Sequence, residues 1–141
     1  MNSISRLTKL NSSKSNRLFR QALAVERSGK KTDAVEIYKE ALRYHSTHTD
    51  AIINLGVLYY EDGNFSNAIE LYRQGLSAQP KNSLLHYNLG LVLQRLGERE
   101  AAIVSYQKSI EFQPDNANAF NNIGIIWMQR GDYPSALEAF Q

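Results

Sequence analysis

The chain has no cysteine among its 141 residues and only three prolines. The absence of cysteine excludes disulfide bonds, thiolate metal sites and cysteine nucleophiles. No apolar run approaches the roughly 20 residues that a membrane-spanning helix needs, and the first residues lack the continuous apolar stretch of a secretory signal. With 43% hydrophobic and 21% charged residues, the composition is that of a soluble folded protein, and we expect a cytoplasmic one.

Acidic residues are also missing, in this case from the first 25 positions. Residues 1–31 carry eight basic side chains and one acidic, a net charge of +7, whereas residues 32–141 carry eight basic and 13 acidic side chains, a net charge of −5. A basic arm of this kind can bind nucleic acid or an anionic membrane surface, or direct import into an organelle. The simplest interpretation is a solvated tail over residues 1–14 that leads into or extends the first helix. Nucleic acid is not the partner that we expect.

A short group of residues recurs along the chain every 34 positions. The triplet Asn54-Leu55-Gly56 returns as Asn88-Leu89-Gly90 and as Asn122-Ile123-Gly124. A second glycine, an alanine, an aromatic residue and a proline recur with the same period: Gly63, Gly97 and Gly131; Ala68, Ala102 and Ala136; Tyr72, Tyr106 and Phe140; Pro80 and Pro114. A fixed period of this length indicates a stack of small repeats, each of which contacts its neighbours. Since stacked repeats form long surfaces and not sealed pockets, we expect a protein that binds other polypeptides, and not an enzyme.

Four repeats fit this register, over residues 15–48, 49–82, 83–116 and 117–141, and the last of them is partial. Each repeat is predicted to form two amphipathic helices, which in the second repeat cover roughly residues 50–62 and 66–79. Gly63 should end the first of these, because the residue just after a helix often has a positive φ that glycine adopts without a clash. The following residues are predicted to cap the helices that come after them: Asp50, Asn82, Asp115 and Asn116.

Two of the recurring glycines, Gly56 and Gly90, lie inside predicted helices, where each costs about 1 kcal/mol of helix propensity relative to alanine. A cost that recurs at a fixed period needs a compensating gain. We expect these glycines to permit close approach of the two helices of a repeat, with the recurring alanines, such as Ala102, on the facing surface. The aromatic residue of each second helix, such as Tyr106, should fill the space between one repeat and the next.

These residues closely resemble the tetratricopeptide repeat, and the resemblance covers residues 15–141. The first repeat is divergent, because Gln21-Ala22 replaces the Leu-Gly pair. The resemblance implies an all-α fold, a right-handed α-solenoid of helix-turn-helix repeats that acts as a protein-interaction scaffold. The last repeat stops at Gln141, part-way along its second helix. We therefore expect either a piece of a longer protein or an open C-terminal face that another molecule buries, for which self-association is one route.

In the tetratricopeptide family the first helices of successive repeats line the concave wall of the stack, as the resemblance implies. On that wall the sixth place of the repeats holds Arg20 and then a ladder of asparagines, Asn54, Asn88 and Asn122. An asparagine amide can pair with a peptide backbone whatever its sequence, so the ladder suits a polypeptide that threads along the groove. The alternative is that asparagine merely suits a solvent-facing place beside a glycine. The further candidate contacts on this wall are Tyr60, Tyr87, Leu91, Asn121 and Ile125.

The ladder is similar to the one in the O-linked N-acetylglucosamine transferases, where asparagines hold the substrate chain. This resemblance leaves a second function open, a substrate-recruiting or regulatory segment of a larger enzyme such as a glycosyltransferase. The clamp with which other family members grip the acidic tails of chaperones is not expected, since Asn54 alone fits its pattern. The three histidines do not form a cluster of three or four converging ligands. We therefore predict neither a metal nor any other cofactor.

Overall fold

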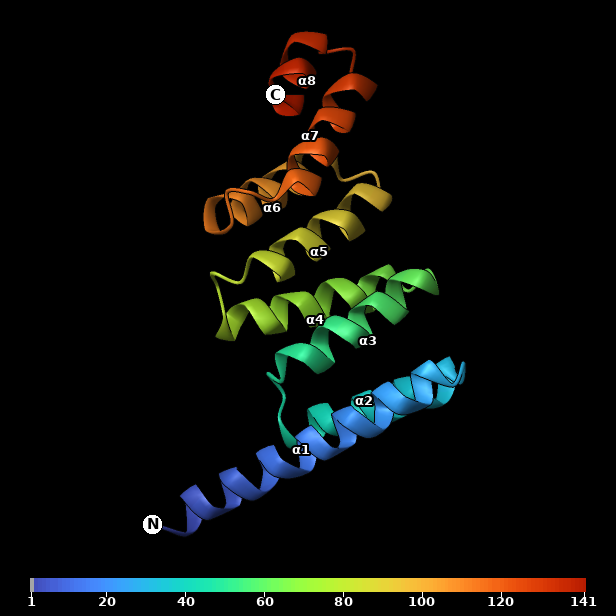
Figure 1. Cartoon of the computed structure of the whole chain (residues 1–141), viewed down its shortest axis with the longest axis vertical. Coiled ribbons are helices and arrows are strands. Elements are labelled where there is room, and N and C mark those ends of the chain that lie inside the picture. The colour runs from blue at the N-terminus through green and yellow to red at the C-terminus, as the bar shows by residue number, and fades with distance from the viewer. Residues whose placement is uncertain (1) are drawn as a thin grey trace. The chain divides into compact units, whose positions relative to one another are not determined.

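The structure is a computed structural model that describes residues 2–141, and these residues form helices joined by short turns (Figure 1). The helices are α1 (Ser3–Arg27), α2 (Lys31–Tyr44), α3 (Thr49–Glu61), α4 (Phe65–Ala78), α5 (Ser83–Arg95), α6 (Arg99–Phe112), α7 (Ala117–Gln129) and α8 (Tyr133–Phe140). No strand occurs within residues 2–141, so the predicted all-α class is confirmed. Within the same residues, no helix is both long and apolar enough to span a bilayer.

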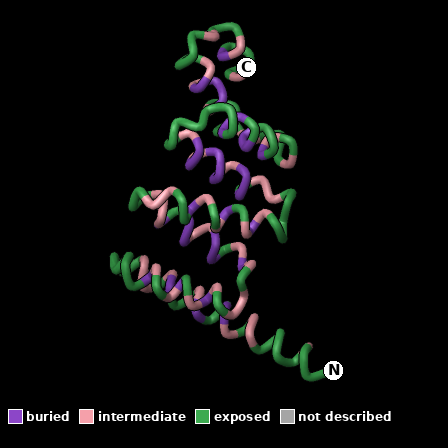
Figure 2. Tube along the Cα trace, turned by 180° about the vertical axis from the view of Figure 1, so that it is seen from behind, coloured by how far each residue is buried: buried purple, intermediate pink, exposed green. Residues whose placement is uncertain are grey.

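Consecutive helices pair as helical hairpins, α1 with α2, α3 with α4, α5 with α6 and α7 with α8. The chain divides into two compact units, of which unit 1 ends at Ala78 and unit 2 begins at Gln79. Within unit 1, α2 also packs on α3, and within unit 2, α6 also packs on α7. Figure 2 shows that the buried positions gather on the sides of the helices that face their neighbours. A connected part of the unit 1 core consists of Ala22, Ala34, Tyr38, Ala51, Leu55 and Leu58.

Each hairpin turns at a glycine in the left-handed region. The φ angles are 87° at Gly29, 76° at Gly63, 82° at Gly97 and 77° at Gly131. A side chain at such a φ would clash with the backbone, which is why glycine recurs at this place. The predicted helix stops are confirmed.

The glycines inside the first helices make room for an aromatic ring. A Cβ atom on Gly56 would lie 2.5 Å from Cε1 of Tyr72, and a Cβ atom on Gly90 would lie 2.7 Å from Cδ1 of Tyr106. The nearest atoms therefore belong to the aromatic residue of the second helix of the same repeat. The ring of the second helix therefore takes the space that a side chain on the glycine would occupy, and the expectation that the alanines face these glycines stays a prediction.

Two of the four predicted caps are confirmed. Oδ1 of Asn82 accepts a hydrogen bond from the backbone N–H of Leu85 at 3.1 Å, and Asn116 does the same for α7 at 3.2 Å. The predictions for Asp50 and Asp115 were wrong. Asp50 already lies inside α3, and the residue that caps α7 is the one after Asp115.

The cap of α3 is a histidine, at the place where the next two repeats have asparagine. Nδ1 of His48 accepts a hydrogen bond from the backbone N–H of Ala51 at 3.2 Å. Nε2 therefore carries the ring hydrogen and donates it to Oδ1 of Asn16 in α1, 2.8 Å away. The ring is 8% exposed and its centroid lies 5.1 Å from that of Phe19 and 5.7 Å from that of His45. Burial, and after it repulsion from His45, lowers the pKa of His48 below its ordinary value.

Protonation of His48 should remove this cap, because it places an N–H donor against the N–H of Ala51. The pKa of His48 is lower in the folded than in the unfolded chain, so the contribution of the cap to the free energy of unfolding is complete above pH about 6.5. That contribution is lost as the pH falls through the folded-state pKa. We expect a loss of about 1 kcal/mol, which is typical of an N-cap, in urea unfolding followed by circular dichroism.

The His48→Asn variant should keep the cap and lose this pH dependence, since asparagine does not titrate. The His45→Asn variant, which leaves the cap in place, is the matched control and should keep most of the pH dependence of stability. A pH profile that is the same in the wild-type chain and in His48→Asn would contradict the capping role.

Candidate functional site

The first helices of the hairpins, α1, α3, α5 and α7, position the candidate residues. In α3 the third, seventh and tenth places of the repeat, Ala51, Leu55 and Leu58, face the core and are buried. The fifth and ninth places lie one turn apart on a single side of each helix. They hold Phe19 and Leu23, Ile53 and Val57, Tyr87 and Leu91, and Asn121 and Ile125. All of these side chains are half-buried or exposed, and all except Asn121 are apolar.

Asn54 is bound to a tyrosine of the preceding hairpin. Its Nδ2 donates to the hydroxyl of Tyr38 at 3.1 Å, and that hydroxyl donates to Oε2 of Glu26 at 2.6 Å. Tyr38 is fully buried, and burial, followed by the bond to Glu26, raises its pKa to about 12. One chain of hydrogen bonds therefore links α1, α2 and α3 within unit 1.

Unit 2 repeats this arrangement. Nδ2 of Asn122 donates to the hydroxyl of Tyr106 at 3.4 Å, and Tyr106 donates to Oε1 of Gln94 at 2.6 Å. Asn122 also donates to the hydroxyl of Tyr87 at 3.4 Å. The regular spacing of the asparagines thus has a structural cause in both units. An amide has two donor hydrogens and an acceptor oxygen, so capacity for a ligand remains, and the predicted peptide contacts of Asn54 and Asn122 stay a prediction.

The remaining predicted site residues differ in exposure. Asn88 is only 8% exposed, the least accessible member of the ladder. Arg20 is exposed on α1, and the half-buried ring of Tyr60 has its centroid 5.7 Å from that of Phe65. Asn121 is exposed on α7. A hydrogen bond between Asn122 and Tyr87 joins α5 to α7 in unit 2.

The first helices of unit 2 carry almost no charge, a feature that was not predicted. No charged residue occurs in α7, and Arg95 is the one charged residue of α5. Leu84 and Met128 are each 49% exposed on these helices. A solvent-facing helix surface ordinarily carries charged side chains. Charges counted for each helix, and not only for residues 1–31 and 32–141, would have revealed this neutral surface.

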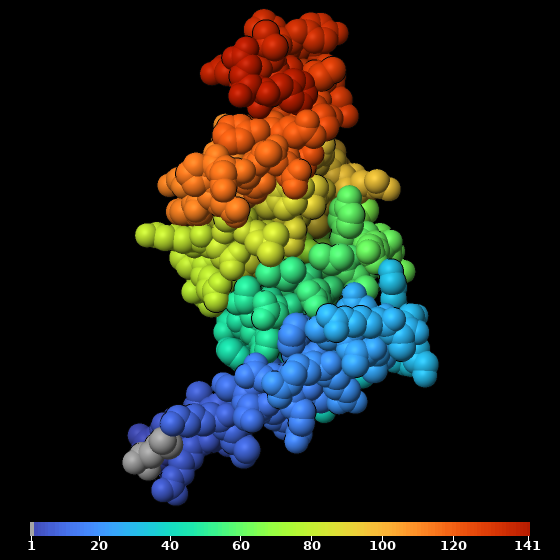
Figure 3. Space-filling view, viewed as in Figure 1, coloured from blue at the N-terminus to red at the C-terminus, as the bar shows by residue number. Residues whose placement is uncertain are grey.

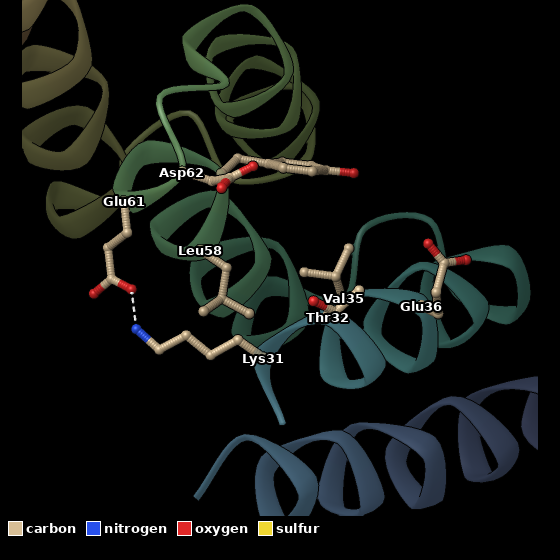
Figure 4. A pocket seen from close by; sticks show the side chains of 8 residues that line it. Lys31, Thr32, Val35, Glu36, Leu58, Glu61 and Asp62 are labelled. Carbon is tan, nitrogen blue, oxygen red and sulfur yellow. Dashed lines mark hydrogen bonds and ion pairs between the residues drawn. The ribbon is translucent and has the colours of Figure 1, made fainter. Parts of the chain in front are cut away.

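A hollow of about 290 Å³ lies between the start of α2 and the end of α3 in unit 1. Figure 4 shows the side chains of Leu58 and Val35 between Glu36 and an ion pair, in which Nζ of Lys31 is 2.6 Å from Oε2 of Glu61. The bond to Glu61 raises the pKa of Lys31. This hollow could not be predicted from the sequence, because it depends on how two neighbouring repeats place their turns.

A second hollow, of about 530 Å³, opens between α7 and α8 in unit 2. Its lining includes Asn121 together with Phe120, Glu138 and Phe140. The predicted site residue Asn121 therefore lies on the hollow between the two helices of the last hairpin. Neither hollow is a metal site, since no group of three or more histidine, aspartate or glutamate side chains within residues 2–141 is placed to hold a metal ion.

Comparison with known proteins identifies the repeat over part of the chain. Residues 56–97 match a family model described as "TPR repeat", and residues 83–116 match one described as "Tetratricopeptide repeat". No curated protein matches the chain.

Solved structures share the fold over most of the chain. The crystal structure of MamA is 24% identical with a TM-score of 0.85, and the match covers 96% of this chain and 80% of that one. MamA from residue 41 to its end, from Desulfovibrio magneticus RS-1, is 21% identical with a TM-score of 0.80, and the match covers 89% of this chain and 71% of that one. A tetratricopeptide repeat protein from Parabacteroides merdae ATCC 43184 is 24% identical with a TM-score of 0.82, and the match covers 91% of this chain and 51% of that one. The likeness concerns the fold, and it confirms the predicted solenoid class of tetratricopeptide hairpins.

The hydroxyl of Tyr38 should contribute measurably to stability, because it joins three helices. We expect Tyr38→Phe to lower the free energy of unfolding by about 1–3 kcal/mol, the range for a bond to a charged group with a buried partner. Since the folded-state pKa of Tyr38 is raised to about 12, the wild-type chain should lose stability as the pH rises from about 10 through that value.

Urea titrations at neutral and alkaline pH measure both effects. The loss of stability at alkaline pH should be smaller in Tyr38→Phe, although Tyr72, whose pKa burial also raises, still contributes. Tyr133→Phe is the control, because that side chain is 67% exposed and its substitution should change little. Equal stability of Tyr38→Phe and the wild-type chain at neutral pH would show that the hydrogen bonds of the Tyr38 hydroxyl make no net contribution to the free energy of unfolding.

Proposed function

We propose that this chain, which contains tetratricopeptide repeats, is a protein-interaction scaffold whose first helices bind an uncharged polypeptide segment. The observation that carries the proposal is the nearly uncharged surface of α5 and α7 in unit 2, where Leu91 and Ile125 are only half-buried at the ninth places. Apolar side chains outside a core at a fixed period supply contact area along an extended surface. The repeats are preformed, so binding orders the partner more than the scaffold.

Unit 2 offers the best-defined surface for this partner. Leu91 and Ile125 are half-buried at the ninth places of α5 and α7, and Tyr87 and Asn121 lie at the fifth places. The neighbouring exposed side chains on α7 are amides or apolar groups and not ions. A charged segment would lose hydration there without gaining a partner charge, so the surface favours a neutral segment with apolar side chains.

The resemblance of the asparagine ladder to that of the O-linked N-acetylglucosamine transferases remains part of this proposal. It supports a polypeptide backbone that runs along the first helices. The bonds of Asn54 and Asn122 to tyrosine hydroxyls explain the same spacing without a ligand. We therefore assign the main contacts to the fifth and ninth places, with the asparagines as additional donors. A recruiting segment of a larger enzyme would use the same surface, and no observation favours it separately.

The test begins with peptides selected on the wild-type chain from a random phage-displayed library. We expect the selected peptides to be apolar and low in charge, and their affinity to change little with salt. The double variant Leu91→Gln and Ile125→Gln should bind them roughly tenfold more weakly or worse, since each change removes about 1 kcal/mol of apolar contact. Titration calorimetry measures the affinity.

A matched control is Val104→Gln, because Val104 is 51% exposed on α6, a second helix. This variant should bind the peptides as the wild-type chain does. Selected peptides that are strongly charged, or that bind the double variant unchanged, would place the binding surface elsewhere. The triple change of Asn54, Asn88 and Asn122 to alanine is less informative, since it also removes bonds within the fold.

A second candidate function, self-association, is favoured by the surface of α8. Leu137 and Phe140 are 61% and 44% exposed, whereas Ile103 and Tyr106, at the same places of the preceding repeat, are 6% and 0% exposed. In unit 2, α7 packs on α6 and bonds Tyr106 through Asn122. Exposed apolar side chains at places that are buried elsewhere mark an interaction surface. We propose a second copy of the chain for it, with a following segment of the same protein as the alternative.

Light scattering after gel filtration, over a series of concentrations, tests this assignment. The molar mass of the wild-type chain should rise with concentration, and Leu137→Asp should hold the chain as a monomer because the carboxylate would be buried without a partner. Val104→Asp adds the same charge on α6 and should leave the mass profile unchanged. A wild-type chain that is monomeric at every concentration would remove this function without affecting peptide binding.

A further inference from the structure

The helix α1 continues beyond the packed body of unit 1. Its first bonds to α2 come from Lys14, whose Nζ donates to the hydroxyl of Tyr44 at 2.6 Å, and from Ser15, whose Oγ donates to the backbone oxygen of Ala41 at 2.8 Å. Before these residues, the described side-chain bonds stay within α1 and its cap. Figure 2 shows this segment as almost wholly exposed, and Figure 3 shows it projecting from the rest of unit 1.

Three large apolar side chains line one side of the projecting segment. Ile4, Leu7 and Leu10 are 75%, 58% and 64% exposed. Residues three apart are neighbours on a helix surface, so these side chains form a continuous apolar strip. A helix of this length is marginal in water unless its apolar side is covered. Unit 1 provides no such cover.

Cations lie beside this strip. Arg6 and Lys9 are exposed on the adjoining side of the same turns, and Arg17 and Arg20 continue the positive charge along the exposed part of α1. The first acidic residue of the chain is Glu26. None of the ion pairs in the described part of the chain includes a cation of α1. The positive charge is therefore available to an anionic partner.

We propose that the projecting segment of α1, residues 3–14, docks on the surface of an anionic lipid bilayer. Ile4, Leu7 and Leu10 enter the boundary between head groups and acyl chains, while Arg6 and Lys9 stay with the lipid phosphates and carboxylates. A helix with one apolar side and a basic flank lies in the plane of the interface and does not span the membrane. Each cation near an anionic leaflet adds to the attraction.

The apolar strip together with the neighbouring cations favours a bilayer over other anionic partners. A nucleic acid would use the cations and leave Ile4, Leu7 and Leu10 in water, because its backbone offers only charge to them. This docking uses residues outside the surface that the proposed scaffold function assigns to polypeptides. Failure of one idea therefore leaves the other standing.

The experiment uses the full chain and exploits its lack of cysteine. The Ile4→Cys variant takes a single environment-sensitive fluorophore, and it is titrated with phosphatidylcholine vesicles that contain or lack phosphatidylserine. We expect a blue shift and a gain in intensity with the anionic vesicles, and binding that weakens steeply with salt. A label at Lys108→Cys, on an exposed side of α6, should show no shift.

Vesicle sedimentation of unlabelled variants then separates apolar from charge contributions. The double variant Leu7→Gln and Leu10→Gln should bind anionic vesicles about tenfold more weakly or worse, as should Arg6→Gln with Lys9→Gln. The control, Leu96→Gln with Val104→Gln, removes side chains that are 47% and 51% exposed elsewhere and should bind normally. All of these positions lie outside the core, and circular dichroism checks that each variant is folded.

Three results would overturn the proposal. Wild-type chain that does not bind phosphatidylserine vesicles excludes docking. Binding that survives the loss of Leu7 and Leu10 but not of Arg6 and Lys9 shows charge alone, without insertion. If duplex DNA binds as tightly as the anionic vesicles, and the substitutions of Leu7 and Leu10 weaken neither interaction, the segment binds nucleic acid instead.

Discussion

The hairpins of the last three repeats depend on the aromatic ring of the second helix, which lies against the glycine inside the first helix. Tyr106 adds hydrogen bonds to this contact. Its ring occupies the space above Gly90, its hydroxyl donates to Gln94, and the same hydroxyl accepts a bond from Asn122 of the following helix. The ring therefore holds its own hairpin together, and the hydroxyl fixes the helix that packs on it. Because the tyrosine is fully buried, its hydroxyl needs these partners.

This constraint decides which side chains remain for other molecules. The glycine, the tyrosine and the small or aliphatic residues at the third, seventh and tenth places are used in packing. The asparagines are partly used as well, through their bonds to the tyrosine hydroxyls. The fifth and ninth places of the first helices are used less, although Phe19 packs on the core of unit 1 and the hydroxyl of Tyr87 accepts a bond from Asn122. Their side chains remain half-buried or exposed, and they are apolar in almost every repeat. Surface chemistry can therefore vary along the chain without any change in the fold.

The two units use this freedom in different ways. The first helix of unit 1 is strongly basic and extends into water, whereas the first helices of unit 2 present neutral amide and apolar groups. A basic strip attracts anions over a distance that salt controls, and a neutral surface discriminates by shape and apolar contact. Under the two proposals the chain would combine a surface for anions with a surface for uncharged segments. His48 lies at the place where the following repeats have a capping asparagine, and we predict that it makes the cap of α3 sensitive to acid.

Much of the fold was predictable because the repeat period fixes local conformation. The helix bounds of the second repeat lie within one residue of those predicted, and the four turn glycines have the positive φ that their position implied. The errors came where two residue types could do the same job. Asp50 is of a residue type that often caps helices, whereas His48 lies at the place that corresponds to Asn82 and Asn116 and is the cap.

The candidate site was predictable in its outline and not in its detail. The period alone determined that the first helices share one set of outward places, since equal spacing along a helix puts residues on the same side. It could not determine that Asn54 and Asn122 bond to tyrosines, because those partners come from another helix. The exposure of Ile4, Leu7 and Leu10 was likewise decided by where α2 ends against α1. By itself the sequence determined the repeat and its helices; the tertiary structure decided which polar groups are bound within the fold and which apolar ones are left for a partner, because burial depends on neighbours that are distant in the chain.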